Sequence, residues 1–328
     1  MKKIVHVAVG VIFDAQKNIL IAKRSDDQHQ GGLWEFPGGK VEADETVQQA
    51  LARELDEEVG IQVAPELMTP LIQIPFHYPD KSVYLDVWNV FETNSGDFKV
   101  AHGKEGQPVV WVPLAELSDY EFPAANKAIL NALLLPELIA ITPDSDVESI
   151  RSYIAGCLGL GIEKSPGIIQ LRAPQIAQAE FVELAKVLYP QCLQAGVKLV
   201  WNCPLDWFEA EGSEYSDGLH LSVQNFVALS DMEKRPVVDD VWLSTSVHNL
   251  AELEQAQQLG VDYLLVSPVQ KTSSHPDAEP LSDAELKAIL DHTRIPVYGL
   301  GGLAVADLAE VKKQGMQGIA GISAFYQL

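Results

Sequence analysis

Basic residues and cysteines are both scarce in this chain of 328 residues. Lys and Arg number 23 against 46 Asp and Glu, which gives a formal net charge of −23. A protein of that sign repels the phosphate backbone, so we expect no nucleic-acid polymer as a partner. The cysteines are Cys157, Cys192 and Cys203, an odd number without CxxC spacing. This pattern argues against a disulfide framework and against a cysteine zinc site.

Long apolar runs are also missing. The opening stretch MKKIVHVAVGVIFD is too short in apolar residues to span a membrane, and no small-residue cleavage site follows it. We therefore expect a strand there rather than a signal peptide, no membrane partner, and a cytoplasmic protein. Hydrophobic residues still make up 47% of the chain, which is enough for a core, and the length predicts two domains.

The first part of the chain, to about residue 130, mixes strand and helix patterns without strict alternation. Strands are predicted over 4–13, 18–23, 82–92 and 108–112. Helices are predicted over 45–59, ending at Gly60, and over 124–135. This is an α+β pattern.

From Leu138 onward, short apolar strands alternate with helical segments. The predicted strands are 138–142, 167–172, 197–202, 218–221, 241–244, 262–267, 296–300 and 318–321. Helical patterns between them include 181–188, 249–259, 283–290 and 306–314, and the weakest is 224–230. Eight β/α units predict a (β/α)₈ TIM barrel, so the chain as a whole is α/β. We place the domains at 1–134 and 137–328, joined where a helix runs into Pro136.

Glutamates cluster on one side of the helix predicted over 45–59. At 100° per residue the apolar stripe of this helix consists of Val47, Leu51, Leu55 and Val59. Glu54, Glu57 and Glu58 fall in a neighbouring arc, with Glu58 against the stripe. Such carboxylates repel one another, and a core face adds a desolvation cost. A hard cation, Mg²⁺ or alternatively Mn²⁺, would neutralise them; the other explanation is a solvated acidic face.

The spacing around these glutamates resembles the Nudix box at every defined position. The matching residues are Gly39, Glu45, Arg53, Glu54, Leu55, Glu57, Glu58, Gly60 and Ile61. Further features resemble the MutT branch of the family, which hydrolyses 8-oxo-dGTP: Arg24, His29, and the runs 35–39, 78–80, 103–108 and 122–126. The resemblance covers roughly residues 1–132 and implies an α/β/α sandwich-type Nudix domain.

The resemblance also implies a metal site and a reaction. The metal ligands would be the carbonyl of Gly38 and the carboxylates of Glu54, Glu57, Glu58 and Glu105. A water activated by the metal would attack a nucleoside triphosphate and release the monophosphate and pyrophosphate, with Glu54 as the first choice of base. Arg53 would orient the neighbouring glutamates, or it would form only a helical pair with Glu57.

Other residues would contact the nucleotide. Asn126 resembles the base-reading asparagine of the family, because an amide offers both a donor and an acceptor to 8-oxoguanine. Phe36 and Tyr78 would flank the base, unless they belong to the core. Arg24, together with Lys23, would reach the phosphates, and His29 would contact substrate or lie on a loop. Lys81 is a departure, because we expect an arginine at that position.

Fragments of the second domain resemble the thiamine phosphate synthase and thiazole tautomerase (TenI-like) superfamily. They are 170–172, 218–221, 246–248, 262–263, 267–269 and 299–302. The synthase pattern has a lysine where this chain has Pro174, and aspartates where it has Cys203 and Asn225. Without the metal-binding aspartates and the lysine, pyrophosphate and its metal cannot be held, so we expect that synthase activity has been lost.

Barrels of this type bind phosphate after strands seven and eight. The corresponding residues here are Gly301, Gly302, Ile322 and Ser323, and a thiazole or thiamine phosphate is the expected ligand. His248 matches the acid/base histidine of the tautomerase branch, or it is a loop histidine that opens the fifth helix. The barrel is thus either a tautomerase-like enzyme or a module that binds phosphate compounds without catalysis.

Together these features predict a Mg²⁺-dependent 8-oxo-dGTP diphosphatase that keeps a damaged nucleotide out of DNA synthesis and so serves DNA replication and repair. The alternative is a Nudix hydrolase of another nucleotide or of a metabolite like thiamine diphosphate. In that alternative the barrel is a non-catalytic sensor.

Overall fold

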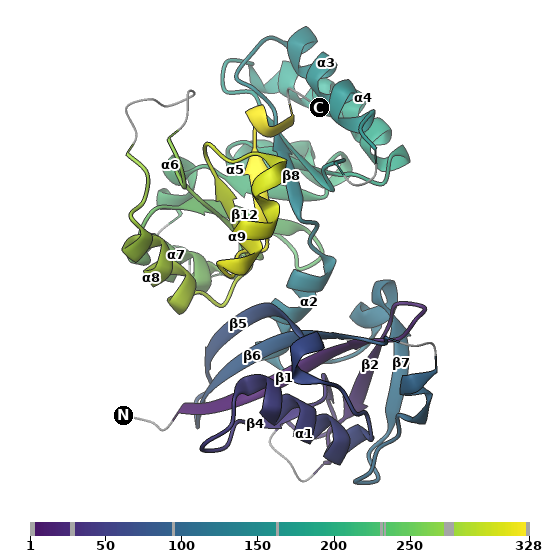
Figure 1. Ribbon diagram of the computed structural model, residues 1–328. Coiled ribbons are helices and arrows are strands. Elements are labelled where there is room, and N and C mark those ends of the chain that lie inside the picture. The colour runs from purple at the N-terminus through teal and green to yellow at the C-terminus, as the bar shows by residue number, and fades with distance from the viewer. Residues whose placement is uncertain are drawn as a thin grey trace. The chain divides into compact units, whose positions relative to one another are not determined.

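The computed structural model describes residues 4–26, 30–93, 96–161, 164–229, 232, 234–271 and 279–325. The chain divides into two compact units, Met1–Leu134 and Leu135–Leu328 (Figure 1). Each unit has its own buried hydrophobic clusters. Among the described residues, we find no helix that is both long enough and apolar enough to span a bilayer.

The first unit is built on a seven-stranded sheet in the order β3-β2-β1-β6-β5, with β4 paired to β1 and β7 paired to β2. The strands are β1 (Ile4–Phe13), β2 (Asn18–Lys23), β3 (Trp34–Glu35), β4 (Gly38–Lys40), β5 (Thr69–His77), β6 (Ser82–Phe91) and β7 (Val109–Pro113). Strands β1 and β6 pair in parallel from Ile4 opposite Ser82 to Phe13 opposite Phe91, and the other pairs are antiparallel.

Two helices, α1 (Val47–Val59) and α2 (Lys127–Leu134), pack on opposite faces of this sheet (Figure 1). Ala8 and Ile12 of β1 belong to the cluster under α1, whereas the odd-numbered Val9 and Val11 belong to the cluster under α2. Alternate residues of a strand face opposite sides, so one strand serves both layers. Short 3₁₀ turns occur at Pro65–Leu67, Asp97–Val100, Leu114–Asp119 and Ala124–Asn126.

The chain around α1 explains where this helix begins and ends. Thr46 accepts a hydrogen bond from the backbone of Gln49, whose side chain returns one to Thr46, forming a capping box. The helix therefore begins at Val47, two residues after the predicted start. Gly60 ends it with φ of 73°, a conformation that favours glycine.

The second unit is a closed barrel of eight parallel strands in chain order, which confirms the predicted (β/α)₈ fold. The strands are β8 (Leu138–Ile141), β9 (Ile168–Arg172), β10 (Lys198–Asn202), β11 (Gly218–Leu221), β12 (Trp242–Val247), β13 (Tyr263–Val266), β14 (Val297–Leu300) and β15 (Gly318–Gly321). The helices are α3 (Val147–Leu158), α4 (Gln178–Gln194), α5 (Leu205–Glu211), α6 (Val223–Val227), α7 (Leu250–Leu259), α8 (Asp283–His292) and α9 (Leu308–Lys313). The short α6 lies where the helical pattern was weakest.

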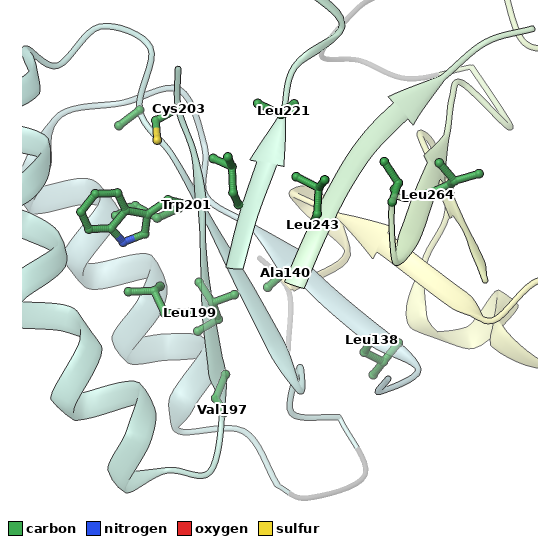
Figure 2. Close-up of a cluster of buried hydrophobic side chains, with 14 of the residues drawn as sticks. Leu138, Ala140, Val197, Leu199, Trp201, Cys203, Leu221, Leu243 and Leu264 are labelled. Carbon is green, nitrogen blue, oxygen red and sulfur yellow. The ribbon is translucent and has the colours of Figure 1, made fainter. Parts of the chain in front are cut away.

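Alternation along the barrel strands separates two layers of side chains. Leu199 and Trp201 of β10 belong to the large cluster between strands and helices (Figure 2). Trp201 contacts Phe181 of α4 edge to face. Val200, between Leu199 and Trp201, belongs to a smaller cluster inside the barrel. Several of the residues that line the barrel cavity at the strands' C-terminal ends are polar, and Asn202 is one of them.

Candidate functional site

A cavity of about 420 Å³ opens beside β1, β4 and β6 in the first unit. Its apolar wall consists of Val5, Val7, Val9, Val83 and Leu85. Its polar lining includes Arg24, Glu35, Lys40, Tyr78, Lys81 and Asn126. An apolar slot with a few polar groups at its rim suits a flat heterocycle.

A second cavity of about 340 Å³ contains the acidic residues Glu58 and Glu105, together with Lys23. Arg24 and Glu35 line both cavities, so the two spaces adjoin. One end of the combined site is therefore largely apolar, and the other carries carboxylates and cations.

The tight approach of α1 to β4 places two of the box glutamates. Glu58 Oε2 accepts a hydrogen bond of 3.0 Å from the backbone N–H of Gly38. A Cβ at Gly39 would overlap the carboxyl group of Glu54, so a larger residue here would displace the end of that side chain. The Glu54 side chain is 17% exposed, whereas that of Glu57 is 60% exposed. Glu54 and Glu58 thus face the strand, and Glu57 faces solvent.

Glu58 lies in an unusually unfavourable environment for a charged carboxylate. Burial raises its pKa to about 8, the Gly38 amide offsets part of that rise, and the negative charges of Glu35, Glu54 and Glu105 add to it. The carboxylate oxygens of these glutamates are the ligands that hard divalent cations prefer. Within the described residues, no group of three acidic, His or Cys side chains meets the geometry of a metal site. The fit to a divalent cation therefore rests on donor chemistry and on uncompensated charge.

Arg53 makes more contacts than a simple helical pair. Its guanidinium donates to Glu45 at 2.8 Å, to Glu54 Oε1 at 2.9 Å and to Glu57 at 3.2 Å. It also donates to the carbonyl of Lys40 at 3.1 Å. The planar guanidinium of Arg53 thus connects the start of the helix, two glutamates of the Nudix box and the end of β4.

The heterocycle-sized cavity places an amide among aromatic rings. Asn126 is only 8% exposed and lines this cavity. Phe36 stacks on Phe122 with ring centroids 5.3 Å apart, and Tyr78 has the ammonium of Lys81 6.0 Å from its ring centroid. Lys81 therefore still lies at the cavity although it lacks the planar guanidinium expected there.

The second unit has a cavity of about 410 Å³ at the C-terminal ends of its strands. The polar side chains that line it are Gln170, Arg172, Asn202, His220, Ser222, Ser246, His248, Ser267 and Ser323. Gly301, Gly302, Gly321 and Ile322 line it as well. Its described lining contains no Asp or Glu, although the chain has 46 of them. Such a lining favours an anionic ligand.

His220 reaches the cavity from a fully buried position on β11. Its Nδ1 is 2.9 Å from Ser244 Oγ, and its Nε2 is 3.4 Å from Ser246 Oγ. Burial, and to a smaller extent the charge of Arg172, lowers the pKa of His220 to about 3. The ring is therefore neutral at physiological pH.

His248 follows β12 directly and lines the same cavity. Its Nδ1 is 3.1 Å from Glu252 Oε2, and its Nε2 is 3.4 Å from Ser267 Oγ. This histidine thus has one ring nitrogen at a carboxylate and the other beside a cavity serine.

Comparison with known proteins assigns both units. The NUDIX domain family matches residues 8–132, and the thiamine monophosphate synthase family matches residues 138–325. An 8-oxo-dGTP diphosphatase of Escherichia coli is 40% identical over 133 residues, 40% of this chain and 98% of that protein. A thiamine-phosphate synthase of Chloroflexus aurantiacus is 35% identical over 186 residues, 56% of this chain and 82% of that protein. The chain belongs to both families.

The Nudix hydrolase domain brings together most of the residues that the sequence singled out. Nudix hydrolases generally use divalent metal ions, and Glu58 and Glu105 line one cavity here while Glu54 faces β4 beside it. Glu57 lies apart, exposed to solvent. His29 lies outside the described residues.

The thiamine monophosphate synthase domain likewise gathers its predicted residues in one place. The cavity lining includes His248, Gly301, Gly302, Ile322 and Ser323. Cys203, where we expect an aspartate in the synthase pattern, is buried in the cluster on the helix side of the barrel (Figure 2). Pro174 and Asn225 are not part of the cavity lining.

Sequence reasoning gave no site role to several residues that line the cavities, although most of them lie within the runs and fragments that resemble the two families. In the Nudix domain they are Glu35 and Lys40, and in the barrel they are Gln170, Arg172, Asn202, His220, Ser222, Ser246 and Ser267. A usable signal was present, because polar residues at alternate positions near the ends of barrel strands, such as Gln170 and Arg172, must face the interior.

Buried His220 predicts a pH dependence for the stability of the barrel. Its pKa falls from the usual 6.5 to about 3 on folding, so below pH 6.5 the unfolded chain binds a proton that the folded one excludes. Its contribution is fully present above pH 6.5 and is lost as the pH falls toward 3. Between pH 7.5 and 5.0 the wild type should lose about 2 kcal/mol more of its free energy of unfolding than His220→Asn. Urea titrations at both pH values measure this difference; equal losses would refute the buried neutral state.

Proposed function

We propose that the Nudix domain hydrolyses 8-oxo-dGTP to 8-oxo-dGMP and pyrophosphate with Mg²⁺, and so keeps the damaged nucleotide out of DNA synthesis. The observation that carries this proposal is a single site with two ends. Asn126 lies in an apolar cavity suited to a base, and that cavity adjoins the carboxylate-lined space through Arg24 and Glu35.

The base end of the site supports a preference for the oxidised purine. The 8-oxo form carries a hydrogen on N7 beside the O6 acceptor, whereas guanine has an acceptor at N7. An amide has one donor group and one acceptor group, so Asn126 can pair with both O6 and N7–H. Asn126 is almost fully buried. With unmodified guanine, whose N7 is an acceptor, the amide oxygen of Asn126 would have no hydrogen-bond donor, which costs binding energy.

The phosphate end of the site supports metal-dependent hydrolysis. We assign Gly38, Glu54, Glu58 and Glu105 to the metal, with Glu57 at the solvent edge; Mg²⁺ would neutralise phosphate charge and make water more acidic. Lys23 and Arg24 lie in the same cavity and suit the remaining phosphate oxygens.

The assignment of the base follows from the contacts of Arg53. Because the guanidinium of Arg53 donates to Oε1 of Glu54, we assign proton acceptance from the attacking water to Oε2. Arg53 also fixes the rotamer of Glu54 by its contacts with Glu45 and with the carbonyl of Lys40. It acts as a positioning residue.

Replacing Glu54 with Gln tests this assignment. The amide keeps the shape of the side chain but neither accepts the proton nor neutralises a cation, so kcat for 8-oxo-dGTP should fall by about 10²- to 10⁴-fold. Glu66→Gln, at an exposed position of the turn after α1, is the matched control and should keep wild-type turnover. Unchanged turnover in Glu54→Gln would exclude it both as base and as ligand.

Replacing Asn126 with Ala tests the base preference. Loss of two amide hydrogen bonds should reduce the ratio of kcat/KM for 8-oxo-dGTP to that for dGTP by about tenfold to a hundredfold. Asn131→Ala, on α2 and outside the cavity lining, should leave the ratio unchanged. A wild-type enzyme that prefers dGTP, CTP or thiamine diphosphate would contradict the proposal itself.

For the barrel, we propose a phosphate-ligand site without a metal, with a thiazole phosphate as the ligand, His248 as its acid/base group and no synthase activity. The observation behind this proposal is a cavity with Arg172 and without acidic side chains in its described lining. Gly301 and Gly302 have φ of 101° and 73°, so their backbones can approach a phosphate closely.

Metal removal separates the two proposed sites. With EDTA, nucleotide hydrolysis should stop, while calorimetric binding of thiazole phosphate to the full chain should keep the same Kd. Arg172→Ala should weaken that binding by about tenfold or more, whereas Arg151→Ala, at an exposed position of α3, should not. Chemical conversion of the bound compound would mark an enzyme and its absence a sensor; lack of binding by both thiazole and thiamine phosphate would overturn the barrel proposal.

A further inference from the structure

We propose that Glu252 is a positioning residue that holds His248 in the tautomer protonated at Nδ1, so that Nε2 faces the barrel cavity as a proton acceptor. The inference rests on the proposed function of the barrel only in so far as His248 serves a ligand there. It adds to that function that His248 first accepts a proton from the ligand, at Nε2, rather than donating one to it.

The chain geometry brings the two side chains together at the junction of β12 and α7. Oε2 of Glu252 accepts a hydrogen bond of 2.7 Å from the backbone N–H of His248 and lies 3.1 Å from its Nδ1. The other oxygen accepts from the side chain of Asn249 at 2.9 Å. Both oxygens of the carboxylate are therefore held, and Oε2 is fixed against the ring.

The chemistry of the pair decides the tautomer. An ionised carboxylate only accepts hydrogen bonds, so Nδ1 of His248 must carry the hydrogen. In the neutral ring Nε2 then has a free lone pair. Nε2 is 3.4 Å from Ser267 Oγ, and both His248 and Ser267 line the cavity. The basic atom of the ring is thus the one that a ligand meets.

A proton balance follows from this arrangement. Nε2 accepts a proton from one atom of the ligand, the imidazolium is stabilised by Glu252, and the same proton returns to a different atom of the ligand. In this sequence no net proton, electron or leaving group is exchanged, so the overall step is an isomerisation. His220, the other histidine in the described lining, has serine hydroxyls at both ring nitrogens, and these do not select a tautomer.

A purely structural role for Glu252 is the competing explanation, since it also binds the backbone at the start of α7. Asn249 is the N-cap of that helix and accepts from the backbone of Glu252 at 3.0 Å. Asn249→Ala weakens the same helix end and removes the donor to Oε1, but it leaves Oε2 held by the backbone N–H of His248. It is therefore the matched control for Glu252→Ala, which removes Oε2 itself.

The test is ¹⁵N NMR of the full chain with labelled histidine, with the His248 signals assigned by their loss in His248→Asn. In the wild type, Nδ1 should show the shift of a protonated ring nitrogen and Nε2 that of an unprotonated one. Glu252→Ala should mix or reverse this pattern. Glu252→Gln should retain it, because the amide oxygen still accepts, and Asn249→Ala should retain it too.

The outcomes separate this inference from the barrel proposal. Protonation at Nε2 in the wild type, or an unchanged pattern in Glu252→Ala, would overturn the inference even if thiazole phosphate binds. The expected pattern without any ligand binding would uphold the positioning of His248 and overturn the proposed function. Where conversion of the ligand is measured, Glu252→Ala should lower kcat by about 10- to 100-fold with little change in KM.

Discussion

The first unit depends on one electrostatic constraint, the packing of a carboxylate-rich helix against a glycine strand. Burial and the charges of Glu35, Glu54 and Glu105 raise the pKa of Glu58 to about 8, because a charged carboxylate is unfavourable there without a counter-charge. The hydrogen bond from the Gly38 amide stabilises the charged form of Glu58 in part. The guanidinium of Arg53 links Glu54 and Glu57 to the end of β4. The negative charge that remains uncompensated favours the binding of a divalent cation.

The two units solve the same problem in opposite ways. Both units belong to families that act on phosphate compounds. Because the chain carries a net charge of −23, each unit needs local groups that attract an anion. The Nudix domain gathers acids that would attract a cation, and the cation would in turn attract phosphate. The barrel excludes acids from its described lining and offers Arg172 and glycine backbones instead. Cys203, where we expect an aspartate in the synthase pattern, is packed on the helix side of the barrel.

Sequence patterns were reliable where one physical preference dominated. The strands Ile4–Phe13 and Asn18–Lys23 have the predicted bounds, because their buried faces give a clear pattern. The sequence analysis did not predict β5, because Pro70 and Pro75 argue against a strand. Both prolines are tolerated because β5 is an edge strand, at the end of the sheet order. β3 and β4 are too short for any periodicity. The strand predicted over 241–244 runs on to Val247, which carries Ser246 into the barrel and puts His248 at its rim.

By itself, the sequence determined both families, both fold types and the cluster of box glutamates, because spacing along one helix or one strand is a local property. Only the tertiary structure decided which members of these sets act together. Glu57 faces solvent while Glu54 and Glu58 face β4, and His220 is neutral because the barrel buries it completely. Burial, and the field of charges contributed by other strands, arise from contacts between distant segments, and no local pattern contains them.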